Sequence, residues 1–304
     1  MFIEEDLQEL RRERFAPHAV VNYLRRVAAH VRAQLDANPA AVRSIWSVAL
    51  GFFAADFLTA VALALGTERL LASRFFLDTA LVIPPTFAFV TLNLGLLRDA
   101  NGYRLSALNV PITLTLLRVV LVPGLALLLI EHHFALAFAI YLLASFTDVA
   151  DGWIARRAGQ ITRLGTVLDP LVDIVFNLTL FCALAASGLL PAWVGWVAVL
   201  RYGLLLVGGA GLYVFVGPLR IQPTLFGRMT GVVIAALVGL LTLLHALRGA
   251  LADALAPLTS VALGALLSAT VAQVVVLGWY NLRVMRGKAE SQGRVVGDVR
   301  WGAR

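Results

Sequence analysis

Four aspartates between positions 148 and 173 are the residues of this sequence with the clearest capacity for chemistry. Asp148 and Asp151 are three residues apart, and Asp169 and Asp173 are four apart, so each pair occupies one face of a helix. We call these four residues the aspartate cluster. Carboxylates that gather on facing helices repel one another unless cations lie between them. The spacing therefore predicts a divalent cation site between two helices.

The ligand types narrow the choice of metal and of substrate. Carboxylate oxygens suit hard cations such as magnesium, manganese and calcium, and segment 148–173 contains no His or Cys that would favour zinc or copper. Gly152 and Ala155 share the face of the first two aspartates and leave space for a bulky group. Arg156 adds a guanidinium that can bind phosphate. The segment therefore favours a substrate that carries phosphate.

The elements that position these residues are membrane helices. Hydrophobic residues make up 60% of the 304 residues, charged residues make up 14%, and the mean hydropathy is +0.85, unlike a soluble domain. Eight apolar stretches are long enough to cross ~30 Å of hydrocarbon. They are residues 46–66, 75–97, 111–131, 134–155, 166–188, 192–216, 229–247 and 257–281. We predict an all-α fold, a polytopic membrane helical bundle.

Basic residues predict the orientation of this bundle. If the N-terminus is cytoplasmic, the external loops contain only Arg69, Arg74 and Arg248, and most other basic residues lie on the cytoplasmic side. This asymmetry places the aspartate cluster at the cytoplasmic ends of two consecutive spans. The net charge of +7 favours contact with anionic membrane lipids, and the dispersed arginines argue against a nucleic-acid partner.

We expect the chain to divide into four parts. Residues 1–45 form an amphipathic segment, which lies in the membrane interface or packs on the enzyme as a solvated helix. Residues 46–107 form two accessory transmembrane helices, which act as an anchor and not as a cleaved signal. Residues 108–283 form a core of six transmembrane helices, and residues 284–304 form a polar, disordered cytoplasmic tail.

The motif around the aspartates resembles that of a known family. The segment fits D-x2-D-G-x2-A-R-x8-G-x3-D-x3-D at all eight fixed positions, and this pattern is typical of the CDP-alcohol phosphotransferases. The eight positions are Asp148, Asp151, Gly152, Ala155, Arg156, Gly165, Asp169 and Asp173. Asn109, Pro111, Thr115 and Arg118 are in addition similar to the start of the first core helix in bacterial phosphatidylglycerophosphate synthases.

The resemblance implies a role for each of these residues. The aspartate cluster would hold Mg²⁺ or Mn²⁺, with two ions expected, and Asp173 would also act as the general base. The nucleotide of the donor would contact residues from both motifs. These residues are Asn109, Thr115, Arg118, Gly152, Ala155, Arg156 and Gly165.

Three further arginines are candidates for binding a phosphate on the acceptor. Arg201 lies inside an apolar run, where a guanidinium is costly unless it serves a partner. Arg220 and Arg228 lie on the expected cytoplasmic side and could complete a basic pocket with Arg201. Anchoring by the positive-inside rule explains Arg220 and Arg228 equally well.

The resemblance implies a phospholipid-synthesis enzyme of the bacterial inner membrane, with its active site facing the cytoplasm and with a homodimer as a possible assembly. It would transfer a phosphatidyl group from CDP-diacylglycerol to an alcohol, with glycerol 3-phosphate favoured, and release CMP. Other acceptors, such as an inositol phosphate or phosphatidylglycerol, and a soluble CDP-alcohol donor stay open. An ion-coupled transporter and a non-catalytic membrane scaffold are the alternatives from other classes.

Overall fold

The computed structural model describes residues 16–208, 225–247 and 249–298. Across these residues the chain is almost entirely helical and contains no strand. The helices are α2 Pro17–Ala37, α3 Pro39–Gly66, α4 Arg69–Leu92, α5 Val110–Ile130, α6 Phe134–Arg157, α7 Arg163–Ala186, α8 Ala192–Gly203, α10 Leu225–Leu247 and α11 Ala250–Asp298. Short helical turns, Leu94–Leu96 and Leu204–Gly208, follow α4 and α8.

Seven of these helices are long and apolar enough to cross a membrane, counting only the described residues. They are α3, α4, α5, α6, α7, the 229–247 part of α10 and the 250–276 part of α11. The predicted span 192–216 corresponds to a shorter apolar helix, Ala192–Gly208, and its remainder lies outside the described residues. The predicted all-α membrane bundle is therefore confirmed, and the protein is an integral membrane protein.

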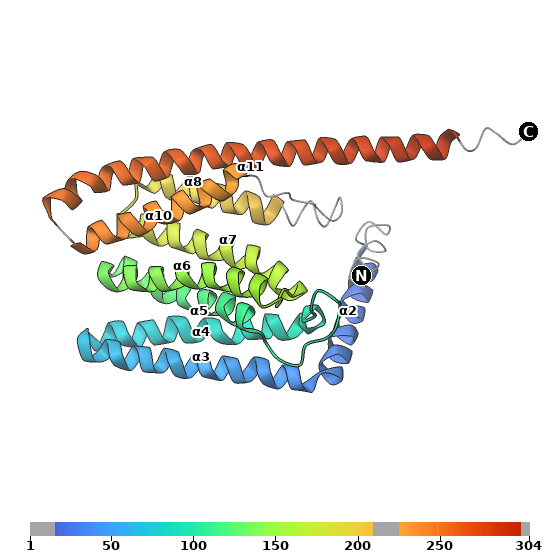
Figure 1. Ribbon diagram of the computed structural model, residues 1–304, viewed down its shortest axis with the longest axis horizontal. Coiled ribbons are helices and arrows are strands. Elements are labelled where there is room, and N and C mark those ends of the chain that lie inside the picture. The colour runs from blue at the N-terminus through green and yellow to red at the C-terminus, as the bar shows by residue number, and fades with distance from the viewer. Residues whose placement is uncertain (1–15, 209–224, 248, 299–304) are drawn as a thin grey trace, which may run out of the picture.

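The long helices run roughly side by side, and α2 crosses one end of the bundle (Figure 1). At that same end lie the loops before α5 and between α6 and α7, whereas the tight turn between α3 and α4, the end of α10 and the start of α11 lie at the opposite end (Figure 1). We call the first the loop end. It contains most of the basic loop residues, so it corresponds to the predicted cytoplasmic side.

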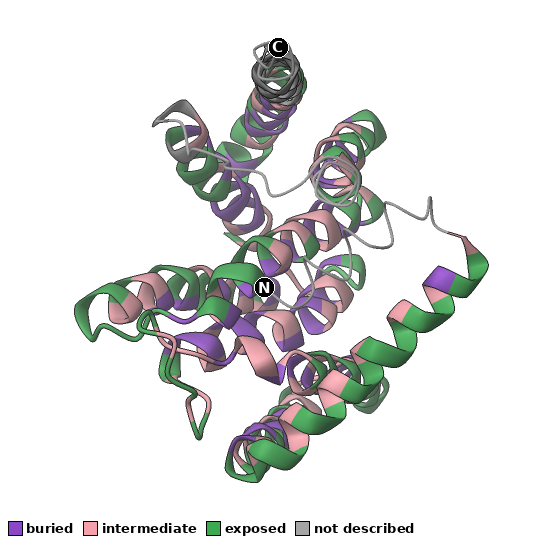
Figure 2. Ribbon diagram, turned by 90° about the vertical axis from the view of Figure 1, so that its right-hand side faces the viewer, coloured by how far each residue is buried: buried purple, intermediate pink, exposed green. Residues whose placement is uncertain are grey.

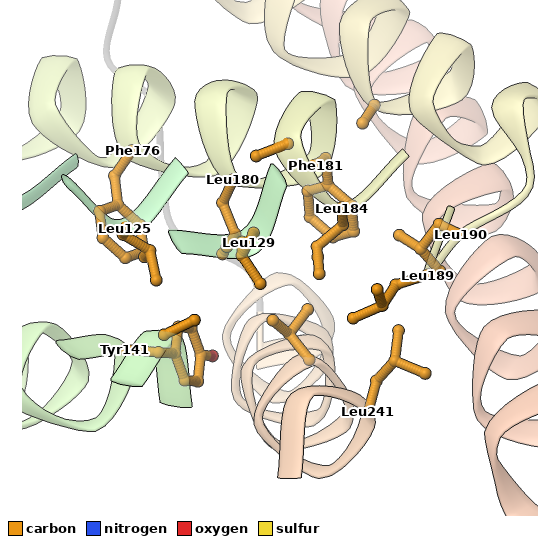
Figure 3. Close-up of a cluster of buried hydrophobic side chains, with 14 of the residues drawn as sticks. Leu125, Leu129, Tyr141, Phe176, Leu180, Phe181, Leu184, Leu189, Leu190 and Leu241 are labelled. Carbon is orange, nitrogen blue, oxygen red and sulfur yellow. The ribbon is translucent and has the colours of Figure 1, made fainter. Parts of the chain in front are cut away.

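Helix α5 is central because it packs against α4, α6 and α7. One buried apolar cluster joins α5, α6, α7, α8, α10 and α11, and Figure 3 shows Leu125 and Leu129 of α5 facing Tyr141 of α6 and Phe176 of α7. A second cluster, which includes Ile45, Phe87, Leu116 and Leu168, attaches α3 and α4 to α5 and α7. Buried residues accordingly line the inner faces of the helices in Figure 2. The two accessory helices are therefore packed on the core.

The structure near the two ends of the chain tests the predicted N-terminal helix and the predicted disordered tail. The predicted N-terminal helix is present as α2, although residues 1–15 lie outside the described part of the chain. The prediction of a disordered tail from residue 284 is wrong as far as Asp298, because α11 continues without a break to that residue (Figure 1). The polar sequence after the last span contains no Pro, and the helix passes through Gly287 and Gly293, although Gly is a common helix-end signal.

Candidate active site

The aspartate cluster forms at one level of three adjacent helices. Asp148 and Asp151 lie in the last half of α6, and Asp169 and Asp173 lie in the first half of α7. Because α6 runs from the opposite end to the loop end and α7 runs back, these segments meet near the loop end. The first half of α5 packs against both. The predicted meeting of two acidic helix faces is therefore present.

The starts of α5 and α7 are held by capping side chains. Asn109 accepts a hydrogen bond from the backbone N–H of Ile112 at 3.3 Å, and Thr162 accepts one from Gly165 at 3.0 Å. Such caps satisfy backbone donors that a helix start would otherwise leave open. The side-chain amide of Asn109 also donates to the Gln160 carbonyl oxygen at 2.8 Å. This bond ties the start of α5 to the loop between α6 and α7.

Arg118 of α5 lies among three of the four aspartates. Its Nη2 atom is 2.7 Å from Asp148 Oδ1 and 2.7 Å from Asp151 Oδ2, and its Nη1 atom is 2.6 Å from Asp173 Oδ1. The Arg118 side chain is 3% exposed, and that of Asp151 is 9% exposed. Asp148 and Asp173 are about half exposed. The guanidinium therefore links one buried carboxylate to two that remain accessible.

Thr115, one turn before Arg118, reaches the fourth aspartate. Its hydroxyl oxygen is 3.1 Å from Asp169 Oδ1 and 3.2 Å from Asp151 Oδ2, and also 3.1 Å from the Pro111 carbonyl oxygen. A hydroxyl has one proton to donate, so it serves these acceptors in turn. Thr115 thereby connects the acids of α6 and α7 from a buried position.

A cavity of about 180 Å³ opens beside the cluster, between α5, α6 and α7. Most of the predicted nucleotide contacts and two aspartates line it. These residues are Thr115, Gly152, Ala155, Arg156, Gly165, Asp151 and Asp169. Asn109 does not line the cavity, but its side chain bonds to Gln160, which does. Arg118 is not among the lining residues and contacts the aspartates instead.

Of the three arginines predicted to bind the acceptor phosphate, the structure describes the side chain of Arg201. Arg201 of α8 donates from Nη1 to the Tyr202 hydroxyl at 2.9 Å and lies 4.8 Å from the centre of that ring. The Tyr202 ring in turn stacks on Phe181 of α7, and Tyr202 interacts electrostatically with Asp173. Arg220 lies outside the described residues, as does the side chain of Arg228 in α10. The proposed grouping of the three arginines therefore stays a prediction.

The donor chemistry of the cluster fits a hard divalent cation. Three of the four carboxylates share one guanidinium, so negative charge is in excess, and the oxygens are of the type that magnesium and manganese prefer. The Arg118 guanidinium occupies the place between the carboxylates where a metal cation is expected. Within the described residues no three acidic, His or Cys side chains converge closely enough to hold a metal directly. A metal ion shared by several of these aspartates would therefore require their side chains to rearrange.

The pairing of Arg118 with the aspartates is the feature that sequence reasoning missed. Thr115 and Arg118 are three residues apart, the same spacing as Asp148 and Asp151, and this shared face on α5 was a usable signal. A buried guanidinium requires carboxylate partners, and the aspartate cluster was the nearest set in the core.

Comparisons with known proteins agree with the motif. Human cardiolipin synthase (CMP-forming) is 36% identical over 94 residues, 31% of each chain. The CDP-diacylglycerol–glycerol-3-phosphate 3-phosphatidyltransferases of Aquifex aeolicus and Haemophilus influenzae are 37% identical over 70 residues and 41% identical over 68 residues. These matches cover 23% and 21% of this chain and 39% and 37% of the two relatives. The chain thus spans about a third of the length of these relatives.

No solved structure matches this chain. The sequence model of the CDP-alcohol phosphatidyltransferase family matches residues 108–280, which include the aspartate cluster, the cavity beside it and the helices that hold them. The protein belongs to the CDP-alcohol phosphatidyltransferase family.

Proposed function

We propose that this protein transfers a phosphatidyl group from CDP-diacylglycerol to an alcohol and releases CMP. One observation carries the proposal: all eight motif residues are present, and six of them line one cavity between α5, α6 and α7. The small residues Gly152 and Ala155 leave room for the nucleotide, and Arg156 adds positive charge for its diphosphate. The length and apolar composition of the helices suit a lipid-linked donor.

Glycerol 3-phosphate is the acceptor we favour. Two of the relatives carry this acceptor in their names, and Arg201, which donates to the Tyr202 hydroxyl, supplies a cation for the acceptor phosphate. A phosphatidylglycerol-like lipid is the second candidate, because the human relative is a cardiolipin synthase. The asymmetry of basic residues supports a reaction at the cytoplasmic face, and for a bacterial protein this membrane would be the inner one.

The roles that we propose for the acids come from the family resemblance, and their exposure and neighbours support them. Asp148, Asp151 and Asp169 would hold one or two Mg²⁺ or Mn²⁺ ions, with Asp173 close enough to share them. Bound ions would neutralise charge on the diphosphate and on the departing CMP. Asp173, half exposed, would accept the proton of the alcohol as its oxygen attacks the β-phosphorus and the bond to CMP breaks. The Thr115 hydroxyl would hold Asp151 of α6 and Asp169 of α7 close to each other.

The test is CMP release by detergent-purified protein given CDP-diacylglycerol, Mg²⁺ or Mn²⁺ and a panel of acceptors led by glycerol 3-phosphate. Asp148→Asn should lose the activity. Asp253→Asn is the matched control, because Asp253 is exposed at the start of α11, and it should retain the activity. A parallel assay with a soluble CDP-alcohol donor tests the alternative donor class. Folded protein that releases no CMP from either donor would contradict the proposal and favour a scaffold or transporter.

A further inference from the structure

We propose that Arg118 is a built-in counter-cation of the aspartate cluster and competes with divalent metal ions for the same carboxylates. It is then a positioning residue that lowers metal affinity, in contrast to the nucleotide contact that the family resemblance implies. This inference rests on the proposed function, because it requires that the cluster binds metal.

The geometry of Arg118 carries the first step. Its two terminal nitrogens contact oxygens of Asp148, Asp151 and Asp173 at 2.6–2.7 Å. These distances are those of charge-assisted hydrogen bonds. The Arg118 side chain is 3% exposed and that of Asp151 is 9% exposed, so water screens this contact little, whereas Asp148 and Asp173 are about half exposed. One guanidinium therefore holds together carboxylates from α6 and α7 that would otherwise repel one another.

The competition follows from the oxygens that Arg118 uses. A metal ion shared by α6 and α7 needs carboxylates from both helices to converge. In the described residues they converge on the guanidinium and on no common point that could hold a metal. A dication placed among the same oxygens would also repel the guanidinium. We therefore expect a metal ion that binds acids of both helices to turn these carboxylates away from Arg118 and weaken its contacts.

Two features keep this exchange feasible. The Arg118 Nε atom is buried and has no hydrogen-bond partner among the described residues, so the guanidinium is incompletely satisfied in this position. Asp148 and Asp173 are about half exposed, so a metal ion from solution can reach them without unfolding the site. The guanidinium can leave these two acids while α5 itself stays in place.

The experiment measures Mn²⁺ binding to detergent-purified protein by electron paramagnetic resonance, without nucleotide or acceptor. Arg118→Gln should bind Mn²⁺ about tenfold more tightly than the unmodified protein, because a competing cation is removed. Arg118→Lys should fall between the two, because one ammonium cannot contact three carboxylates as the guanidinium does. Arg74→Gln is the matched control, because it removes a remote ion pair with Glu131 of 2.8 Å, and it should leave the affinity unchanged.

Thermal unfolding gives a second measurement. Without metal, Arg118→Gln should melt at a lower temperature than the unmodified protein, and Mn²⁺ should raise its melting temperature by more. If folded Arg118→Gln and Arg118→Lys bind Mn²⁺ as weakly as the unmodified protein, or more weakly, the competition is refuted. Mn²⁺ binding with the expected order but no CMP release would refute only the proposed transferase. No Mn²⁺ binding by either the unmodified protein or folded Arg118→Gln would refute the metal site and this inference together.

Discussion

Arg118 Nη2 lies 2.7 Å from Asp151 Oδ2, and the two side chains are 3% and 9% exposed. This ion pair joins α5 to α6 in a place that water barely reaches. Removing one partner of such a pair leaves an uncompensated charge. Here the two accessible acids, Asp148 and Asp173, share the same guanidinium. The pair therefore connects α5 to α6 at the point where the two accessible acids also contact Arg118.

Asp173→Asn should abolish turnover and preserve donor binding. The amide has a similar shape but cannot take the proton of the acceptor alcohol, and loss of a general base costs about 10²- to 10⁴-fold in rate. The measurements are kcat from CMP release and the Kd for CDP-diacylglycerol. A variant with normal kcat would remove Asp173 from the role of base.

Thr115→Val should reduce kcat/KM by about tenfold, because the hydroxyl that connects Asp151 with Asp169 is lost, and should destabilise the protein by about 1 kcal/mol. Thr113→Val is the matched control, since the Thr113 hydroxyl donates to the backbone of its own helix, at the Asn109 carbonyl oxygen. CMP release and thermal unfolding distinguish the two variants. Equal activity of both would show that the bridge by Thr115 is dispensable.

Gly152→Ala should raise KM for the CDP donor and leave the fold intact. A Cβ atom at this position would lie 3.2 Å from Arg156 Nη1, so the added methyl group would displace Arg156 and narrow the cavity. Alanine favours the helix by about 0.5–1 kcal/mol over glycine, so stability should not fall. Gly51→Ala in α3, where a Cβ would meet no atom within 4 Å, should leave KM unchanged. An unchanged KM in Gly152→Ala would argue against this cavity as the nucleotide site.

Gly124→Ala should loosen the accessory helices from the core. Phe75 of α4 lies directly over Gly124 of α5, so an added Cβ would collide with its ring. Such overpacking costs about 1–3 kcal/mol, measurable by thermal unfolding in detergent. The same substitution at Gly231 in α10, which has open space around it, should not destabilise the protein. Phe75→Leu should restore stability to Gly124→Ala if the collision is the cause.

Arg201→Gln should raise KM for glycerol 3-phosphate by about tenfold, because one cation for the acceptor phosphate is lost. KM for CDP-diacylglycerol should change little, since the cavity lining does not include Arg201. KM for glycerol 3-phosphate is measured by acceptor titration at saturating donor. Arg74→Gln is the control and should leave this KM unchanged. A change in KM for CDP-diacylglycerol alone would indicate that Arg201 binds the donor and not the acceptor.

The helices were largely predictable, and their ends less so. Long apolar stretches predicted the membrane spans because burial of side chains in lipid depends on local composition. The continuation of α11 to Asp298 was missed, because a polar composition alone does not show whether a helix continues beyond the membrane. Arg220 and the side chain of Arg228 lie outside the described residues, so their role in binding the acceptor phosphate stays a prediction.

The sequence by itself determined the four acids, the small residues beside them and the helix faces they occupy. These properties follow from residue type and from the periodicity of a helix, which are local. Only the tertiary structure decided that Arg118 and Thr115 of α5 meet acids of both α6 and α7, and that Arg118 lies outside the cavity wall. Which faces meet depends on how helices far apart in sequence pack together, and no spacing within one segment contains that information.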